Sequence, residues 1–140
     1  MQGICFEDLA IGQSAEMTYT VTAALIEAFA EVSGDNNPVH LDQDYASNTQ
    51  FGGRIAHGML SASFISAVIG TRLPGKGAIY LSQSLRFRRP VKIGDEVTAR
   101  ATITGLDAER GRATLETLCL VGGKTVLDGE AMVMVPRKDA

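Results

Sequence analysis

The 140-residue sequence has only two cysteines, no surplus of positive charge and no long hydrophobic run. Cys5 and Cys119 have apolar neighbours and no spacing typical of metal ligands, so we expect two buried thiols in a reducing cytosol rather than a disulfide. The formal net charge of −3 argues against nucleic acid as a partner, because phosphate contacts require a basic surface. With 45% hydrophobic and 21% charged residues, the composition indicates one ordinary globular domain over residues 1–140.

Signals for secretion and for membrane insertion are missing too. The most apolar helix candidate, residues 59–69, is too short to cross a bilayer and is interrupted by serines. The first residues include Glu7 and Asp8, where a signal peptide would have a basic segment and a long apolar run. We therefore expect a cytoplasmic protein without a membrane partner.

The hydrophobic pattern predicts an α+β chain. The expected helices cover residues 23–32, 43–47 and 58–71. The expected strands cover residues 15–21, 78–88, 97–104, 113–121 and 124–135. Thr22 and Asp42 are typical N-caps for the first two helices, and Gly34 is a typical end for the first. The third helix is apolar nearly all round, so we expect neighbours on most of its sides and a sheet that wraps around it. The apolar stripe of the first helix consists of Leu25, Ile26, Phe29 and Val32.

The stretch between the first two helices, residues 33–42, is rich in turn formers and also carries an acid, an amide and a histidine. Asp35 and His40 are separated by Pro38, which fixes the backbone between them, so their side chains can converge in an irregular loop. A carboxylate and an imidazole placed together can bind one water, one group taking its proton while the other donates or positions. A structural alternative stays open, in which Asp35 and Asn37 only cap a turn and His40 forms a local hydrogen bond.

Metal-dependent and nucleophilic chemistry leave no recognisable pattern. The available metal ligands are Asp35, His40, Asp42, Asp44 and His57. They match no HExxH, paired-cysteine or calcium-loop pattern, so we expect no metal ion. No serine lies in a GxSxG sequence and neither cysteine has a histidine nearby, which argues against a nucleophilic mechanism.

Gly58 begins the most apolar helix, where the first backbone N–H groups have no acceptor within the helix and lie at its positive end. A glycine there lets a carbonyl oxygen approach closely, so the Gly58 N–H is a candidate oxyanion donor. The alternative is a glycine required only by tight packing against a strand. His57 is either a second catalytic base or a structural, hydrogen-bonded histidine, and its apolar neighbours favour the structural role.

Positive charge is concentrated in one segment. The basic cluster consists of Arg86, Arg88, Arg89 and Lys92. In an acidic protein such a cluster can meet the phosphates of a nucleotide, or it can simply form a solvated face of a strand. Both interpretations stay open.

Several longer motifs resemble one family. Residues 29–40, FAEVSGDNNPVH, followed by Ala46, match the hydratase 2 motif throughout. Further similar segments are RIAHGML at 54–60, LPGKG at 73–77, FRRPV at 87–91 and the Gly-Asp pair at 94–95. Over nearly its full length the chain resembles the MaoC-like (R)-specific enoyl-CoA hydratases, especially the short single-hotdog type associated with polyhydroxyalkanoate synthesis.

The resemblance implies a hotdog fold, a curved antiparallel sheet around a central helix, in a homodimer with an acyl tunnel near the interface. It implies Asp35 and His40 as the catalytic pair and the Gly58 N–H as the oxyanion donor. The implied reaction is reversible syn addition of water to trans-2-enoyl-CoA, giving (R)-3-hydroxyacyl-CoA, without a metal or redox cofactor. We expect Asp35 to draw a proton from the attacking water, while His40 shares that water and helps to protonate C2. This reaction would link fatty acid β-oxidation to the supply of polyhydroxyalkanoate monomers.

Contacts to the acyl chain are predicted largely from the central helix. The predicted substrate-binding residues are Asn37, Ala62, Ile65, Ser66, Ile69 and Arg88. At 100° per residue, three of the helical positions lie within about 40° of Gly58 when viewed down the axis, and Ser66 lies further round. Three other functions are considered: an acyl-CoA thioesterase, a 3-hydroxyacyl-ACP dehydratase and an acyl-CoA binding module without activity. The His40 that follows Asn37-Pro38 favours the hydratase over the thioesterase.

Overall fold

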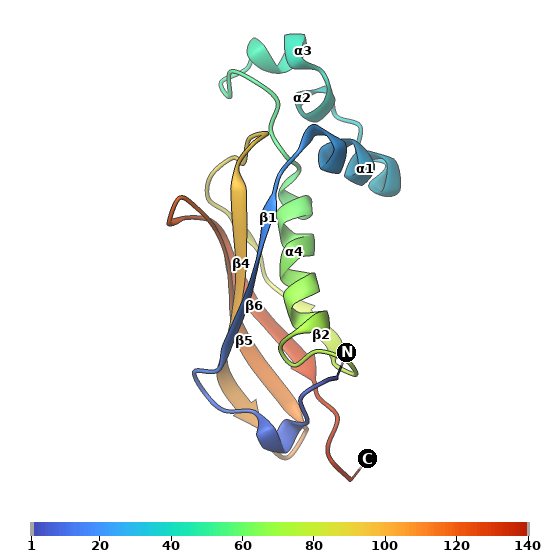
Figure 1. Cartoon of the computed structure of the whole chain (residues 1–140), viewed down its shortest axis with the longest axis vertical. Coiled ribbons are helices and arrows are strands. Elements are labelled where there is room, and N and C mark those ends of the chain that lie inside the picture. Colours follow the sequence, from blue (N-terminus) through green and yellow to red (C-terminus); the bar gives the residue numbers. More distant parts are fainter. Residues whose placement is uncertain (1, 140) are drawn as a thin grey trace.

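The computed structural model describes residues 2–139, which form an antiparallel sheet and a set of helices (Figure 1). The strands are β1 (Ser14–Thr20), β2 (Ile79–Gln83), β3 (Arg86–Phe87), β4 (Glu96–Asp107), β5 (Arg112–Val121) and β6 (Lys124–Met134). The helices are α1 (Ala23–Ser33), α2 (Pro38–Leu41), α3 (Gln43–Ser47) and α4 (Gly58–Thr71), with a 3-10 turn at Phe6–Asp8. The strand order is β1-β4-β5-β6-β2, and β3 pairs with β6.

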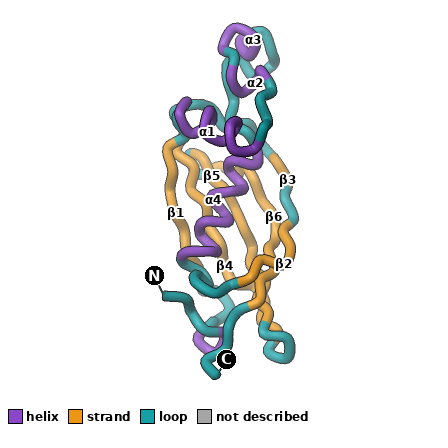
Figure 2. The backbone as a smooth tube through the Cα atoms, turned by 90° about the vertical axis from the view of Figure 1, so that its right-hand side faces the viewer, coloured by secondary structure: helices purple, strands orange, loops and turns teal. Residues whose placement is uncertain are grey.

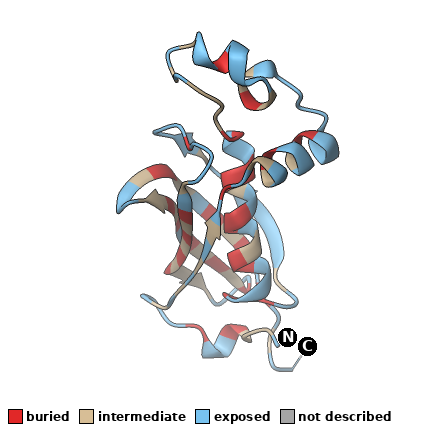
Figure 3. Ribbon diagram, turned by 45° about the horizontal axis from the view of Figure 1, so that its top comes forward, coloured by how far each residue is buried: buried red, intermediate tan, exposed pale blue. Residues whose placement is uncertain are grey.

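Helix α4 runs along the concave face of the sheet (Figures 1 and 2). It contacts β1, β4, β5 and β6, so the sheet curves around it. Its sheet-facing side chains, such as Phe64 and Val68, share one core cluster with inward residues of the strands, such as Val97 and Leu115. The buried residues accordingly gather between α4 and the sheet (Figure 3). This arrangement confirms the predicted α+β hotdog fold.

Helix α4 is less enclosed than its composition predicts. Its buried residues lie on one face, whereas Met59 is 54% exposed and Ser63 and Ser66 are also exposed. The prediction that neighbours surround most of the helix is therefore wrong for a single chain. The outer face carries small uncharged residues such as Ser63 and Ser66, so the sequence lacks the charged stripe of a solvent-exposed face, but these residues contribute little apolar area and do not require burial. No helix within residues 2–139 has the length and apolarity needed to cross a membrane.

Two other burial predictions also fail. In α1, Ile26 is fully buried but Val32 is 82% exposed, because the helix extends beyond the sheet at its C-terminal end. In β2, Ile79 and Leu81 alternate with polar residues as in a half-buried strand, yet they are 57% and 40% exposed. The reason is topological: β2 lies at one end of the strand order, and no element of this chain covers these two side chains.

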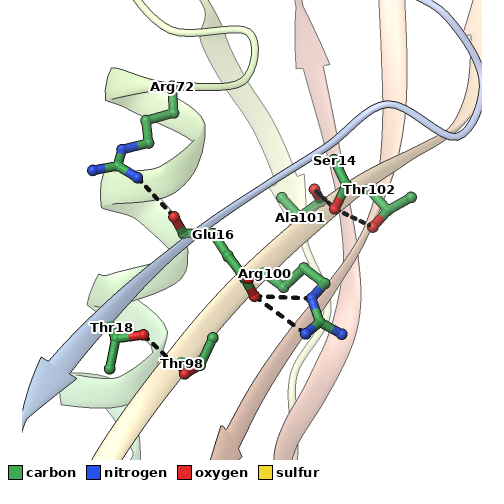
Figure 4. Close-up of polar contacts among 8 residues, drawn as sticks. All are labelled: Ser14, Glu16, Thr18, Arg72, Thr98, Arg100, Ala101 and Thr102. Atoms are coloured by element: carbon green, nitrogen blue, oxygen red, sulfur yellow. Dashed lines mark hydrogen bonds and ion pairs between the residues drawn. The ribbon is translucent and has the colours of Figure 1, made fainter.

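Polar side chains on β1 and β4 support the pairing of these strands (Figure 4). The Thr18 and Thr98 hydroxyls lie 2.9 Å apart across the pair, in register with the Thr18–Thr98 backbone partners. Arg100 forms a salt bridge of 3.1 Å with Glu16. Arg72, just after α4, donates to the Glu16 carbonyl at 2.8 Å and thereby connects the end of the helix to β1.

Helices α1 to α3 cover the end of the sheet at which α4 begins, opposite the end with both termini (Figures 1 and 2). The predicted caps are confirmed: the Thr22 hydroxyl accepts from Leu25 N–H, and Asp42 accepts from Tyr45 N–H. Gly34 ends α1 with φ of 81°, a left-handed conformation that glycine adopts without strain. This end of the molecule brings the loop after α1 above the first turn of α4.

Candidate active site

The loop that carries Asp35 is built by local side-chain hydrogen bonds. The Ser33 hydroxyl accepts from Asp35 N–H at 3.1 Å, and the Asp35 carboxylate accepts from Asn37 N–H at 3.3 Å. The Asn37 side chain accepts from Val39 N–H at 3.2 Å and caps α2, with Pro38 at its first position. Asp35 and Asn37 therefore do cap turns, as the structural alternative proposed. The Asn-Pro pair is the sequence signal that predicts α2, a helix absent from our sequence-based assignment.

His40 lies on α2 and is only 9% exposed. Its Nδ1 lies 2.8 Å from the Ile55 carbonyl oxygen. A carbonyl can only accept, so Nδ1 carries the proton, and the neutral ring presents a lone pair on Nε2. The Arg54 Nε donates to the His40 carbonyl at 2.7 Å, and this second hydrogen bond fixes the backbone of α2 at His40. His40 is thus oriented with its proton-accepting nitrogen free.

His57 is a buried structural histidine, as the sequence indicates. Its side chain is 2% exposed, and its Nε2 donates to the Asp35 carbonyl at 2.9 Å. The His57 and His40 rings stack with centroids 3.9 Å apart. The Phe29 ring also contacts His57, with centroids 4.9 Å apart. The His57 ring therefore fixes the position of the Asp35 backbone by a hydrogen bond and the orientation of the His40 ring by stacking.

Asp35 and His40 converge, although helical spacing would not align them. One side-chain ligand atom from each of Asp35, His40 and His57 lies within 4.8 Å of the others. Asp35 is exposed and His57 is buried, so the cluster runs from the surface inward. An acid and two histidines are suitable metal donors in type, but His57 Nε2 already carries a proton that it gives to a carbonyl. Nε2 of His57 therefore has no lone pair for an ion, and the remaining acceptor of this ring is Nδ1.

Gly58 is the first residue of α4, next to the two histidines. A Cβ on Gly58 would lie 2.5 Å from the Phe87 ring, so close packing against β3 requires glycine here. The packing alternative from the sequence is therefore observed. It does not compete with an oxyanion role, because the backbone N–H at the positive end of the helix stays directed away from the helix interior.

A cavity of about 490 Å³ opens beside this cluster. His40, Gly58 and Arg88 of the predicted site line it, together with His57, Ser61 and residues of the 87–91 segment. The other predicted substrate contacts, Asn37, Ala62, Ile65, Ser66 and Ile69, do not line it. Ile65 and Ile69 are 1% and 2% exposed in the core and Ser66 faces outward, so the roles of these residues in chain-length preference stay predictions.

Ser61 is a cavity residue that the sequence-based prediction missed. It lies on the sheet-facing side of α4 and is 3% exposed. At 100° per residue, Ser61 lies about 60° from Gly58 around the helix axis, in the direction opposite to Ala62. A serine on the buried side of an apolar helix is the signal that could have identified it.

The basic cluster lies at the rim of the cavity. Arg88 forms a salt bridge of 2.9 Å with Asp128 but keeps half of its side chain exposed. Arg88 and Arg89 line both the cavity and a neighbouring hollow that also contains Lys124 and Asp128. The two spaces therefore meet at these arginines, with an excess of positive charge where they join.

Both cysteines are free thiols. Cys119 is fully buried, its S–H donates to the Ser61 carbonyl at 3.4 Å, and burial raises its pKa to about 12. Cys5 is only half-buried. The expectation of thiols rather than a disulfide is confirmed, although complete burial holds for Cys119 alone.

The MaoC like domain model matches residues 8–121 of this chain. An (R)-specific enoyl-CoA hydratase of Rhodospirillum rubrum is 57% identical over 133 residues, covering 95% of this chain and 92% of that protein. Among solved structures, the unliganded R-hydratase PhaJ1 from Pseudomonas aeruginosa superposes with a TM-score of 0.93 at 47% identity, covering 97% of this chain and 88% of that one. The (R)-hydratase from Aeromonas caviae involved in PHA biosynthesis superposes with a TM-score of 0.91 at 46% identity, covering 93% and 99%. This chain therefore belongs to the MaoC-like domain family.

Proposed function

We propose that this protein is an (R)-specific enoyl-CoA hydratase, which adds water reversibly to trans-2-enoyl-CoA and gives (R)-3-hydroxyacyl-CoA. The observation that carries the proposal is the convergence of Asp35 and His40 within 4.8 Å, beside the first turn of α4 and a cavity. The hydratase name of the Rhodospirillum rubrum relative, at 57% identity, supports the same activity.

In our scheme Asp35 and His40 bind one water between them. Because neutral His40 offers a lone pair on Nε2, this nitrogen accepts the proton as the water oxygen bonds to C3. The π electrons move toward C2, and the charge develops on the thioester oxygen. His40 Nε2 then returns its proton to C2 on the same face, which accounts for syn addition, while the Asp35 carboxylate orients the water. We first expected Asp35 to take this proton, although the sequence does not assign which of the two residues delivers which proton; the hydrogen bond of His40 to the Ile55 carbonyl favours the histidine.

The Gly58 N–H is placed to stabilise the thioester oxygen. It is the first residue of α4, so its N–H has no acceptor within the helix and lies at the positive end of the helix dipole. A donor of this kind contributes about 2.7–4 kcal/mol to transition-state stabilisation in hydrolases. No metal ion or redox cofactor enters this scheme, since the two side chains and one N–H account for each proton and charge.

We assign the CoA moiety to the rim at Arg88 and Arg89. The phosphates of CoA are polyanionic, and the rim carries Arg88, Arg89 and Lys124 around one carboxylate, Asp128. Guanidinium groups suit phosphate recognition because their donors form a planar fork. The apolar cavity beyond the rim leads toward Gly58 and suits the less polar part of the thioester.

A homodimer is proposed from the exposed face around β2. Ile79, Tyr80 and Leu81 are 57%, 38% and 40% exposed on a strand at the end of the sheet. An exposed apolar edge strand in a protein of this size is an aggregation hazard unless another chain pairs with it. Pairing of two β2 strands would extend both sheets into one.

The cellular role is proposed from the same relationships. The (R)-hydratase from Aeromonas caviae is involved in PHA biosynthesis, and this chain superposes on it over 93% of its length. We therefore propose a cytoplasmic enzyme that supplies (R)-3-hydroxyacyl-CoA for polymer synthesis.

One assay separates this function from the alternatives. Crotonyl-CoA is followed by its enoyl absorbance and, in parallel, by a free-thiol reagent, with (R)- and (S)-specific 3-hydroxyacyl-CoA dehydrogenases as chiral couplers. Loss of enoyl absorbance without thiol release, and reaction with the (R)-coupler only, is expected. Thiol release would indicate a thioesterase, and binding without turnover would indicate a binding module.

A further inference from the structure

Two buried polar atoms at the start of α4 have no hydrogen-bond partner among the described residues. They are Nδ1 of His57 and Oγ of Ser61, whose residues are 2% and 3% exposed. Both residues line the cavity of about 490 Å³ beside the catalytic pair. A buried polar atom left without a partner costs folding free energy, so such atoms indicate a group bound between them.

The hydrogen bond of His57 Nε2 determines whether Nδ1 of the same ring needs a donor or an acceptor. Nε2 donates to the Asp35 carbonyl, so the neutral ring keeps its lone pair on Nδ1. Nδ1 therefore needs a donor. The Ser61 hydroxyl has one proton to donate and two lone pairs, and no carbonyl of its own helix uses them.

The two atoms belong to the same face of the helix. His57 is the N-cap of α4 and Ser61 follows four residues later, so their side chains are neighbours one turn apart. Helical side chains lean toward the N-terminus, which directs the Ser61 hydroxyl back toward His57. The cavity lining also includes the apolar residues Ala56, Val126 and Leu127, whose side chains offer no hydrogen bond. Its other polar side chains include His40 and Arg88, and Arg88 already pairs with Asp128.

These requirements select a small group with an O–H. A carboxylate, a phosphate or a carbonyl cannot donate to Nδ1. An ammonium group can donate to both atoms, but it leaves the proton of the buried Ser61 hydroxyl without an acceptor. A hydroxyl oxygen does both. Water is the smallest group of this kind, and two fixed protein partners are enough to hold one in a polar corner of a cavity.

We propose that His57 Nδ1 and Ser61 Oγ hold one ordered water, distinct from the water that reacts. The resulting chain runs from Ser61 through this water and His57 to the backbone carbonyl of Asp35. It fixes the tautomer and tilt of the ring on which His40 stacks at 3.9 Å. Ser61 is therefore a positioning residue for the catalytic pair, a role that rests on the proposed hydratase activity.

The water itself is tested without any assay of activity. A high-resolution crystal structure of the wild type is expected to show one water within hydrogen-bonding distance of both atoms, and Ser61→Ala is expected to lose it. Side-chain ¹⁵N NMR is expected to show a hydrogen-bonded Nδ1 acceptor in His57 of the wild type and an altered Nδ1 resonance in Ser61→Ala. Absence of a shared water in the wild type, or an identical His57 spectrum in the variant, would overturn the proposal.

Kinetics then test the positioning role. Ser61→Ala is expected to lower kcat about three- to tenfold, the range for one lost hydrogen bond, with KM within about twofold and the fold retained by circular dichroism. Ser61→Thr keeps the hydroxyl and should restore kcat. Ser63→Ala is the matched control, because its hydroxyl is on the same helix but bonds to the Leu60 carbonyl on the exposed side.

Three kinetic results would contradict the role. They are wild-type kcat in Ser61→Ala, a Thr variant as slow as the Ala variant, or a raised KM with unchanged kcat, which would place Ser61 directly on the substrate. If the wild type fails to hydrate crotonyl-CoA, the proposed function fails, whereas the crystallographic and NMR results still decide whether the water site exists.

Discussion

The carbonyl oxygen of Asp35 accepts a hydrogen bond of 2.9 Å from Nε2 of His57, the residue that precedes α4. The loop with Asp35 is therefore attached to the same helix terminus that presents the Gly58 N–H. His40 stacks on that histidine and bonds to the Ile55 carbonyl. One short segment, residues 55–58, thus sets the positions of the proposed catalytic pair and the proposed oxyanion donor relative to one another.

Replacing Gly58 separates its packing role from its N–H role. Gly58→Ala places a Cβ 2.5 Å from the Phe87 ring, and we expect a loss of about 1–3 kcal/mol in unfolding free energy together with reduced kcat. The double variant Gly58→Ala/Phe87→Ala removes the clash but keeps the backbone N–H. Its kcat should recover to the level of Phe87→Ala alone, measured with crotonyl-CoA beside urea unfolding. A double variant that folds well but stays slow would show that the approach of the substrate itself requires glycine.

The rim cations are tested with a truncated substrate. In Arg89→Glu/Lys124→Glu we expect KM for crotonyl-CoA to rise at least about tenfold, because the loss of even one charge-assisted contact costs about 1.5–3 kcal/mol and about 1.4 kcal/mol is a factor of ten. KM for crotonyl-pantetheine, which lacks the nucleotide, should not change. Arg110→Glu, at an exposed salt bridge in the β4–β5 turn, is the control. Equal effects on both substrates would remove these residues from nucleotide binding.

A charged substitution on β2 tests the proposed dimer interface. Leu81→Lys is expected to convert the dimer to a monomer or to weaken it strongly, because a lysine cannot be buried against a second β2 strand without a partner. Sedimentation velocity at micromolar concentration measures the change. Ile11→Lys, equally apolar and 62% exposed but outside β2, should leave the mass unchanged. A wild type that sediments as a monomer would rule out this interface.

The buried thiol of Cys119 makes the folding stability fall at alkaline pH. Burial raises its pKa from 9.0 to about 12, so the unfolded chain releases this proton at lower pH than the folded chain. The associated stability is fully present below pH 9 and is lost as the pH rises toward 12, with a slope of up to about 1.4 kcal/mol per pH unit from this thiol. Urea unfolding between pH 8 and 10 measures the slope. Cys119→Ala should be less stable than the wild type at pH 8 but should lack this thiol's part of the slope, so the difference should shrink as the pH rises; identical slopes would contradict the assignment.

Sequence reasoning succeeds here where local chemistry determines the structure. Thr22, Gly34 and Asp42 form the caps that their residue types predict, and α4 begins and ends at the predicted residues. The convergence of Asp35 and His40 was only a hypothesis from spacing, and the family resemblance made it the preferred interpretation. The exception is α2, because residues 33–42 were expected to form an irregular loop without a helix.

The failures concern long-range contacts. Helical periodicity places Ile65 and Ile69 near Gly58 but does not show on which side the sheet lies; both residues are in the core, and their role in chain-length preference stays a prediction. The period of two in β2 predicted a buried face that a single chain does not provide. Ser61 was missed because a serine in an apolar helix was treated only as an interruption of the hydrophobic pattern. Its place in the cavity lining depends on contacts with segments distant in the sequence, such as residues 87–91.

The central claim is that Asp35 and His40 act together on one water. Its most direct test is the turnover of crotonyl-CoA by purified Asp35→Asn and His40→Gln, with circular dichroism and melting temperature to establish folding. Each variant should lower kcat by at least about 10²-fold, the lower end expected for acid–base groups, and should keep the fold. Near-normal turnover by either folded variant would contradict the account.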